Sequence, residues 1–120
     1  GILIDKIFNK KEIAMREIES IRDFIWIDDV IDSIIRAIKI QPGKILNIGS
    51  GKSYSIKNVI KIAIKSSGIN KKKIKGNKKL KKESTILLNI NLAKNILEWK
   101  PKITLKEGFE IIFKKTWKKE

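Results

Sequence analysis

The sequence contains neither cysteine nor histidine. Without cysteine, the chain forms no disulfide and offers no thiolate ligand for zinc, which fits a reducing compartment such as the cytoplasm. Without histidine, it has no serine–histidine catalytic triad, no histidine metal site and no general base of ordinary neutral pKa. The sequence therefore predicts no metal site.

Long apolar runs are also absent. No stretch approaches the roughly 20 residues that a membrane-spanning helix needs, and the first residues do not have the pattern of a signal peptide. The chain has 120 residues, of which 42% are hydrophobic. This is the size of one domain with a single core, and we expect it to fold without a membrane.

Arginine is scarce in a chain whose net charge is +15. It occurs only at positions 16, 22 and 36, whereas lysine, isoleucine and asparagine are abundant, a combination that A/T-rich codons produce. Direct reading of bases depends largely on arginine side chains. We therefore attribute the charge to codon bias, and we keep a basic module that binds nucleic acid or another polyanion as the alternative hypothesis.

The hydrophobic pattern predicts an alternation of helices and strands, and hence an α/β fold with few short strands and packed helices. Strands are expected at residues 23–27, 44–48 and 85–88. Helices are expected at residues 1–8, from Asp29 to about residue 40, at 56–67, at 91–97 and from residue 105 onward. The lysine-rich stretch 70–82 is expected to be an exposed loop.

Apolar residues at helical spacing predict the buried face of three of these helices. These faces comprise Val30, Ile31, Ile34, Ile35 and Ile38; then Ile56, Val59, Ile60, Ala63 and Ile64; and finally Leu105, Phe109, Ile112 and Phe113. Trp26, Trp99 and Trp117 are expected in the core or in the wall of a ligand pocket.

Polar residues at the predicted helix starts are expected to act as caps. Asp28 and Asp29 invite a second interpretation, a catalytic pair of carboxylates. Free N–H groups and the helix dipole favour the ionised carboxylate, however, and a general acid needs the protonated form. We therefore predict that Asp29 caps its helix. We expect the same of Ser55, of Asn91 and of a capping box formed by Thr104 and Glu107, with Gly68 ending the helix that Ser55 begins.

The loop around Gly51-Lys52-Ser53 resembles the end of a phosphate-binding P-loop. That motif requires a glycine at position 46, where this chain has Leu46. A triphosphate site is therefore not expected, although the glycines of this loop leave room for a ligand to come close.

Four segments in order resemble the extended short-chain dehydrogenase/reductase family, which contains the nucleotide-sugar epimerases, dehydratases and reductases. They are RDFIWIDDV at 22–30, ILNIGSGKSYSI at 45–56, NINLAKNILEWKP at 89–101 and TLKEGF at 104–109. The resemblance implies that Arg22 contacts the diphosphate of a nucleotide sugar, in which the sugar is linked to UDP, GDP or dTDP. It also implies that Asn47, Gly49 and Ser50 lie on the wall of the active-site cleft.

Other positions depart from the family pattern. Residues 17–19 replace a Gly-Asp-Gly, Asn89 replaces an aspartate and Glu98 replaces a glycine. The family's second phosphate-binding arginine has no match, and Lys78, Lys79 or Lys82 would have to supply its charge.

The family's N-terminal G-x-x-G-x-x-G turn and its catalytic Tyr-x-x-x-Lys pair have no counterpart, since Tyr54 is followed four residues later by Asn58. The resemblance thus implies that residues 1–120 form a single C-terminal substrate-binding domain, with no catalytic residue and no cofactor site, inactive alone. The complete enzyme would be a cytoplasmic homodimer whose N-terminal Rossmann half binds NAD or NADP for hydride transfer at a sugar carbon. A recombinant fragment, a split gene and a remnant without function all fit this expectation.

Overall fold

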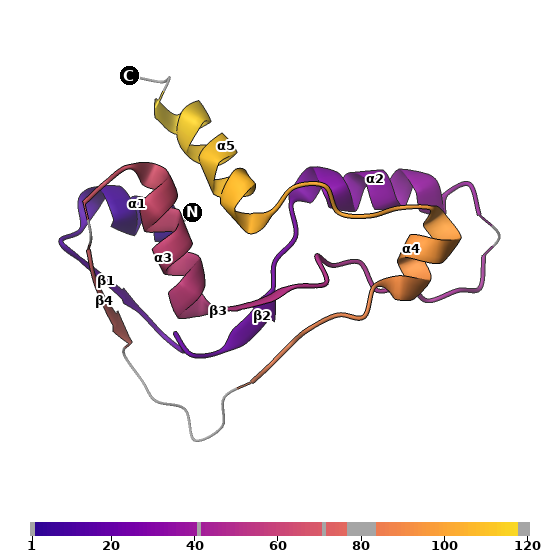
Figure 1. Cartoon of the computed structure of the whole chain (residues 1–120), viewed down its shortest axis with the longest axis horizontal. Coiled ribbons are helices and arrows are strands. Elements are labelled where there is room, and N and C mark those ends of the chain that lie inside the picture. The colour runs from indigo at the N-terminus through magenta and orange to yellow at the C-terminus, as the bar shows by residue number, and fades with distance from the viewer. Residues whose placement is uncertain (1, 41, 71, 77–83, 118–120) are drawn as a thin grey trace.

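The computed structural model describes residues 2–40, 42–70, 72–76 and 84–117, and it describes side chains as far as Lys115 (Figure 1). It confirms a mixed α/β chain with few short strands and packed helices. The elements are, in order, α1 (Ile2–Asn9), β1 (Glu12–Met15), β2 (Ile21–Asp23), α2 (Ile27–Ala37), β3 (Ser53–Ser55), α3 (Ile56–Ser67), β4 (Lys73–Gly76), α4 (Asn91–Leu97) and α5 (Leu105–Trp117).

The strands form two separate pairs. β1 and β4 are parallel, in a register that places Glu12 opposite Lys73. β2 and β3 are antiparallel, and Arg22 lies opposite Tyr54. A single parallel bridge joins Ile21 to Thr85. β2 therefore has a neighbour on each side.

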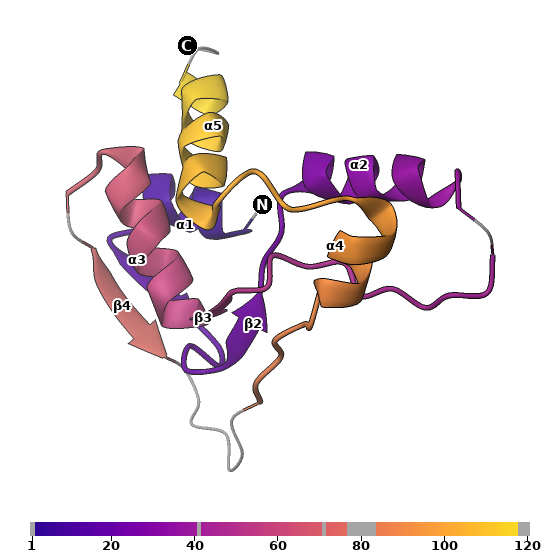
Figure 2. The same cartoon turned by 45° about the vertical axis from the view of Figure 1, so that its right-hand side comes forward.

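The larger part of the core lies where α1, α3 and α5 come together above β1 and β4, and two views agree on this arrangement (Figures 1 and 2). Phe113 of α5 contacts the rings of Phe8 and Phe109, at centroid distances of 5.8 and 6.1 Å. The buried residues of this cluster are Ile7, Ile13, Ile60, Ala63, Ile64 and Phe113. A second cluster joins α2 and α4 around Ala93, Leu97 and Trp99.

Helices α3 and α5 begin as their sequences predict. The Ser55 hydroxyl accepts a hydrogen bond from the Asn58 N–H at 3.1 Å, and Gly68 ends α3 with φ of +71°. Thr104 and Glu107 form a reciprocal capping box, in which the Thr104 N–H donates to the Glu107 carboxylate at 2.8 Å. The expected core face of α3 is confirmed at Val59, Ile60, Ala63 and Ile64. On α5, Phe113 is buried, whereas Leu105, Phe109 and Ile112 of the expected face are only partly buried.

Helix α4 has the expected bounds but a different cap. The N–H of Asn91 donates to the side-chain oxygen of Asn89 at 3.0 Å, so Asn89 supplies the bond that we expected from Asn91. Because Asn91 is already the first residue of the helix, its own side chain lies too far along to cap it.

The strand predictions need four corrections. Residues 44–48 are extended but have no ladder partner among the described residues, and 85–88 make only the single bridge at Thr85. The strand expected at 23–27 lies at 21–23 instead, and the lysine-rich stretch contains β4, whose partner β1 was not anticipated. Strand formation depends on a neighbour across the sheet, and a local pattern does not contain that information.

Helix α2 differs most from expectation. It begins at Ile27 with Trp26 at the N-cap and no side-chain cap, so Asp29 lies inside the first turn and is not the cap. Its buried residues are Asp29 and Ser33, whereas Ile31, Ile34, Ile35 and Ile38 are 47–78% exposed. The expected core face of α2 is therefore open in this chain.

The chain as a whole is flat and open. It measures 51 × 43 × 16 Å and exposes 9112 Å² of surface. A compact protein of its mass, 13.8 kDa, exposes about 6,600 Å². The exposed apolar face of α2 is part of this excess.

Candidate functional site

Strand β2 positions the arginine on which the predicted site depends. The Arg22 Nη1 donates to the carbonyl oxygens of Ile21 and Ser84, both at 2.8 Å, and its Nη2 donates to the Ser84 hydroxyl at 2.7 Å. No acidic side chain among the described residues forms an ion pair with Arg22. Its positive charge is therefore not neutralised by a carboxylate in the described part of the chain.

The next residue of β2, Asp23, fixes the glycine-rich loop. Its carboxylate accepts hydrogen bonds from the Ser50 N–H at 2.8 Å, from the Ser50 hydroxyl at 2.6 Å and from the Gly51 N–H at 3.0 Å. Bonds to an ionised acceptor are about twice as strong as neutral ones. Asp23 thus holds the loop beside the strand that carries Arg22.

Position 49 of this loop has no room for a side chain. A Cβ atom at position 49 would lie 2.9 Å from both the Asp23 carboxylate and the Leu88 side chain. Gly51 has φ of +68°, a backbone conformation that favours glycine. The two glycines therefore allow the loop to approach β2 closely enough for the Asp23 bonds to form.

The predicted site residues come together only in part. Gly49 and Ser50 lie against Asp23, the strand residue next to Arg22, and the Ser50 hydroxyl is already bonded to Asp23 and Lys52; consecutive strand residues point to opposite faces, so these bonds do not bring the loop to the Arg22 side chain. Asn47 is exposed, and its amide donates weakly, at 3.4 Å, to the Asn89 carbonyl. Lys78, Lys79 and Lys82 lie outside the described residues.

Asp23 and Ser84 are the functional candidates that the sequence interpretation missed. Asp23 follows the arginine directly and precedes a run of apolar residues, and this position at a strand end was the available signal. No local signal pointed to Ser84, because it reaches Arg22 from 62 positions further along the chain.

Asp29 organises the segment that closes this end of the molecule. The residue is 4% exposed, and its carboxylate accepts hydrogen bonds from the Lys102 and Ile103 N–H groups, both at 3.0 Å. Its carbonyl accepts a bond from the indole N–H of Trp99, also at 3.0 Å, and Trp99 is 2% exposed. Asp29 therefore binds the chain around Pro101 to α2, and no feature of this arrangement favours a catalytic pair with Asp28.

Two of the pockets in the described chain share Phe24, the residue that follows β2. The smaller, of about 70 Å³, lies between Phe24, Tyr54 and the residues that follow Pro101. The other, of about 300 Å³, is mainly apolar and lies between Trp26 and helix α5. Trp26 is therefore a pocket wall, one of the two positions expected for it, and its indole N–H donates to Asp28 at 3.0 Å.

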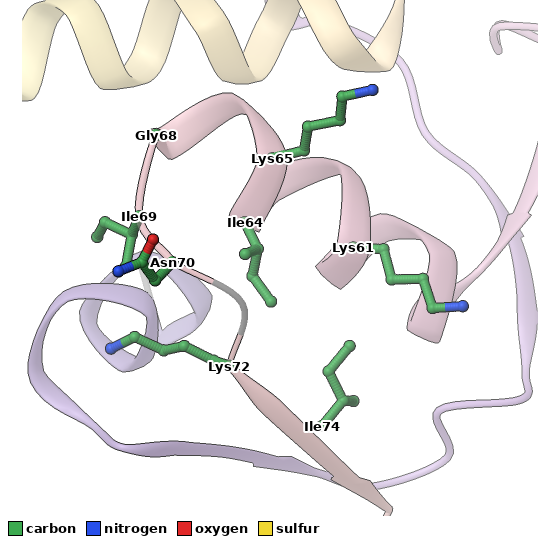
Figure 3. Close-up of a pocket in the computed structure, with 8 residues that line it drawn as sticks. All are labelled: Lys61, Ile64, Lys65, Gly68, Ile69, Asn70, Lys72 and Ile74. Atoms are coloured by element: carbon green, nitrogen blue, oxygen red, sulfur yellow. The ribbon is translucent and has the colours of Figure 1, made fainter.

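A larger pocket, of about 830 Å³, lies away from this site, between the end of α3 and β4. Figure 3 shows the ammonium groups of Lys61, Lys65 and Lys72 directed to different sides of it. The Lys72 ammonium donates to the Lys10 carbonyl at 2.6 Å. The pocket therefore lacks the convergent charges that an anion site requires.

The described residues contain no group of three acidic side chains placed to hold a metal ion. Within the same residues, no helix is both long enough and apolar enough to cross a membrane.

Comparison with known sequences gives a consistent family. Residues 3–112 match the GDP-mannose 4,6 dehydratase family. A putative UDP-glucose 4-epimerase of Methanocaldococcus jannaschii is 32% identical over 92% of this chain and 36% of its own length. A UDP-glucuronate 4-epimerase of Thermodesulfobacterium geofontis is 33% identical over 82% of this chain and 30% of its own length. The chain thus spans about a third of these curated relatives.

Solved structures show the same fold. The UDP-glucose 4-epimerase of Thermotoga maritima superimposes with a TM-score of 0.83 at 24% identity, covering 98% of this chain and 38% of that protein. The UDP-glucuronic acid 4-epimerase of Bacillus cereus, solved with UDP-glucuronic acid and NAD, gives a TM-score of 0.79 at 25% identity, covering 96% of this chain and 38% of that protein.

Proposed function

The chain belongs to the extended short-chain dehydrogenase/reductase family of nucleotide-sugar epimerases and dehydratases, and we propose that it is the sugar-nucleotide-binding portion of such an enzyme. In this role it holds the diphosphate of its ligand through Arg22 and catalyses no reaction by itself. The main support is the geometry of Arg22, a guanidinium fixed by a backbone carbonyl and by Ser84, with no carboxylate partner in the described residues. A guanidinium held in this way matches the oxygens of a phosphate.

The residues present do not fit a dinucleotide cofactor. A pyrophosphate needs free N–H groups in a glycine-rich turn. In the loop at Gly49–Gly51, two of these groups already donate to the Asp23 carboxylate, whose charge repels another anion. We therefore assign NAD or NADP to the remainder of the enzyme, for which the greater length of the relatives leaves room.

The exposed apolar face of α2 supports this division. Four isoleucines on one side of the helix are about half exposed or more, and the extended segment 44–48 beside them has no strand partner among the described residues. Apolar patches of this kind mark surfaces that another part of the protein covers. The proposal assigns this cover to the cofactor-binding half.

The proposal is tested by titrating the purified chain with millimolar UDP-glucose or GDP-mannose and monitoring its chemical shifts. We expect weak, saturable binding and no turnover with NAD or NADP. Arg22→Lys keeps the charge but loses the two-pronged geometry, so the affinity should fall by about tenfold or more. The matched control is Arg16→Lys, an arginine with no described hydrogen bond to the site.

An unchanged affinity in Arg22→Lys would refute the phosphate assignment. Binding to a DNA duplex that weakens steeply with salt, without any response to sugar nucleotides, would instead favour the polyanion hypothesis.

A further inference from the structure

The guanidinium of Arg22 has two edges, and the described residues occupy only one of them. The edge formed by Nη1 and Nη2 faces Ser84, whose carbonyl and hydroxyl accept bonds at 2.8 and 2.7 Å. The second proton of Nη1 is taken by the Ile21 carbonyl at 2.8 Å. Three of the five guanidinium N–H groups are thus accounted for.

The backbone acceptors are themselves fixed by the parallel bridge between β2 and the chain at residues 84–86. The Ser84 carbonyl also accepts the Ile21 N–H, and the Ile21 carbonyl also accepts the Ile86 N–H, each at 3.0 Å. Each carbonyl oxygen therefore uses one lone pair for the bridge and the other for Arg22. This arrangement leaves the end of the arginine side chain little freedom to rotate.

The Nε–H and the outer N–H of Nη2 have no partner among the described residues. These two groups are parallel and lie on the same edge, the arrangement that binds two oxygens of one carboxylate or phosphate. The bonds to Ser84 therefore decide which edge of Arg22 a ligand meets.

We propose that Ser84 is a positioning residue: it does not touch the ligand, but it turns Arg22 so that the Nε–Nη2 edge receives one phosphate of the sugar nucleotide. This inference rests on the proposed function and adds to it the edge that binds and the residue that selects it. Arg22 remains the binding residue. Ser84 acts only through it.

The test compares UDP affinity in Ser84→Ala, Ser84→Thr, Arg22→Lys and the double variant with Ser84→Ala and Arg22→Lys, all by chemical-shift titration of the whole chain. Ser53→Ala is the control, because Ser53 lies opposite Asp23 on the neighbouring strand and has no described bond to Arg22. We expect Ser84→Ala to weaken UDP binding about threefold to tenfold, the effect of one hydrogen bond. Ser84→Thr, which keeps the hydroxyl, should restore most of the affinity, and Ser53→Ala should match the wild type.

The double variant identifies the route of the effect. If Ser84 acts through Arg22, Ser84→Ala should cause no further loss once Arg22 is lysine. The Nε–H signal of Arg22 should also shift on addition of UDP in the wild-type chain.

Different results would overturn different claims. Ser84→Ala could lower the UDP affinity equally with arginine and with lysine at position 22, or Ser84→Thr could fail to restore the affinity. Either result would show a merely structural role and overturn the inference. A strong effect of Arg22→Lys with none from Ser84→Ala would also overturn it, while leaving the proposed function intact. If the wild type does not bind UDP, or Arg22→Lys is silent, the proposed function itself fails.

Discussion

Replacing Asp29 should destabilise the fold far more than replacing its neighbour Asp28. The Asp29 carboxylate is buried, and a single oxygen, Oδ2, accepts the N–H groups of Lys102 and Ile103. Asp28 is exposed and, within the described part of the chain, accepts only the indole N–H of Trp26. If both aspartates acted simply as first-turn acids, their replacement would have similar and small effects.

The expected size follows from the groups that each substitution leaves unpaired. Asp29→Ala removes the acceptor of two partly buried backbone N–H groups, and each unsatisfied group costs about 1–2 kcal/mol, so the free energy of unfolding should fall by about 2–4 kcal/mol. Asp29→Asn can keep its amide oxygen at the same place and loses only the charge, which should cost about 1 kcal/mol. Asp28→Ala should cost less than about 1 kcal/mol.

Urea unfolding followed by circular dichroism measures these differences directly. A thermal scan should show a loss of about 4 °C for each kcal/mol. Trp99 provides a local signal, because its indole N–H donates to the Asp29 carbonyl and its environment should change as the segment around Pro101 loosens. Equal effects of Asp29→Ala and Asp28→Ala, both below about 1 kcal/mol, would refute this account and restore a simple role at the helix start.

Two further predictions concern α5 and α2. Hydrogen bonds from the Thr104 N–H and, to a smaller extent, from its hydroxyl lower the pKa of Glu107 from its usual 4.5. The ionised Glu107 therefore stabilises the fold above that pH, and this contribution is lost as the pH falls through the lowered pKa. The difference in unfolding free energy between wild type and Glu107→Gln should thus shrink on titration from about pH 6 toward pH 3. A gap that stays constant would contradict this role. The double variant with Ile31→Glu and Ile35→Glu should leave the stability of the isolated chain nearly unchanged, because both side chains are about half exposed, and should lower its self-association in sedimentation experiments. A cooperative loss of structure would instead show that this face packs within the chain.

The sequence was a reliable guide where structure depends on neighbours along the chain. The caps at Ser55 and Thr104, the stop at Gly68 and the buried face of α3 all follow from contacts within four residues. The family resemblance also held, since it rests on four segments in a fixed order.

Predictions failed where the partner is distant in sequence. β1 meets β4 across about 60 residues, and the bonds from Asp29 to Lys102 and Ile103 cross more than 70. A carboxylate at a helix start has the same local pattern whether it caps the helix or binds a distant loop. The sequence therefore identified Asp29 as structural, but not the contact through which it acts.

The failure on α2 has a different origin. The spacing of Ile31, Ile34, Ile35 and Ile38 is regular, but the described chain leaves these residues 47–78% exposed. A periodic apolar face is typical of a helix that packs against another part of a protein, because isoleucine side chains stabilise a helix only when they are removed from water. The curated relatives are about three times as long as this chain. The discrepancy between pattern and burial therefore supports the proposed function, under which one side of α2 and the segment 44–48, which has no strand partner among the described residues, would pack against the cofactor-binding part of the enzyme.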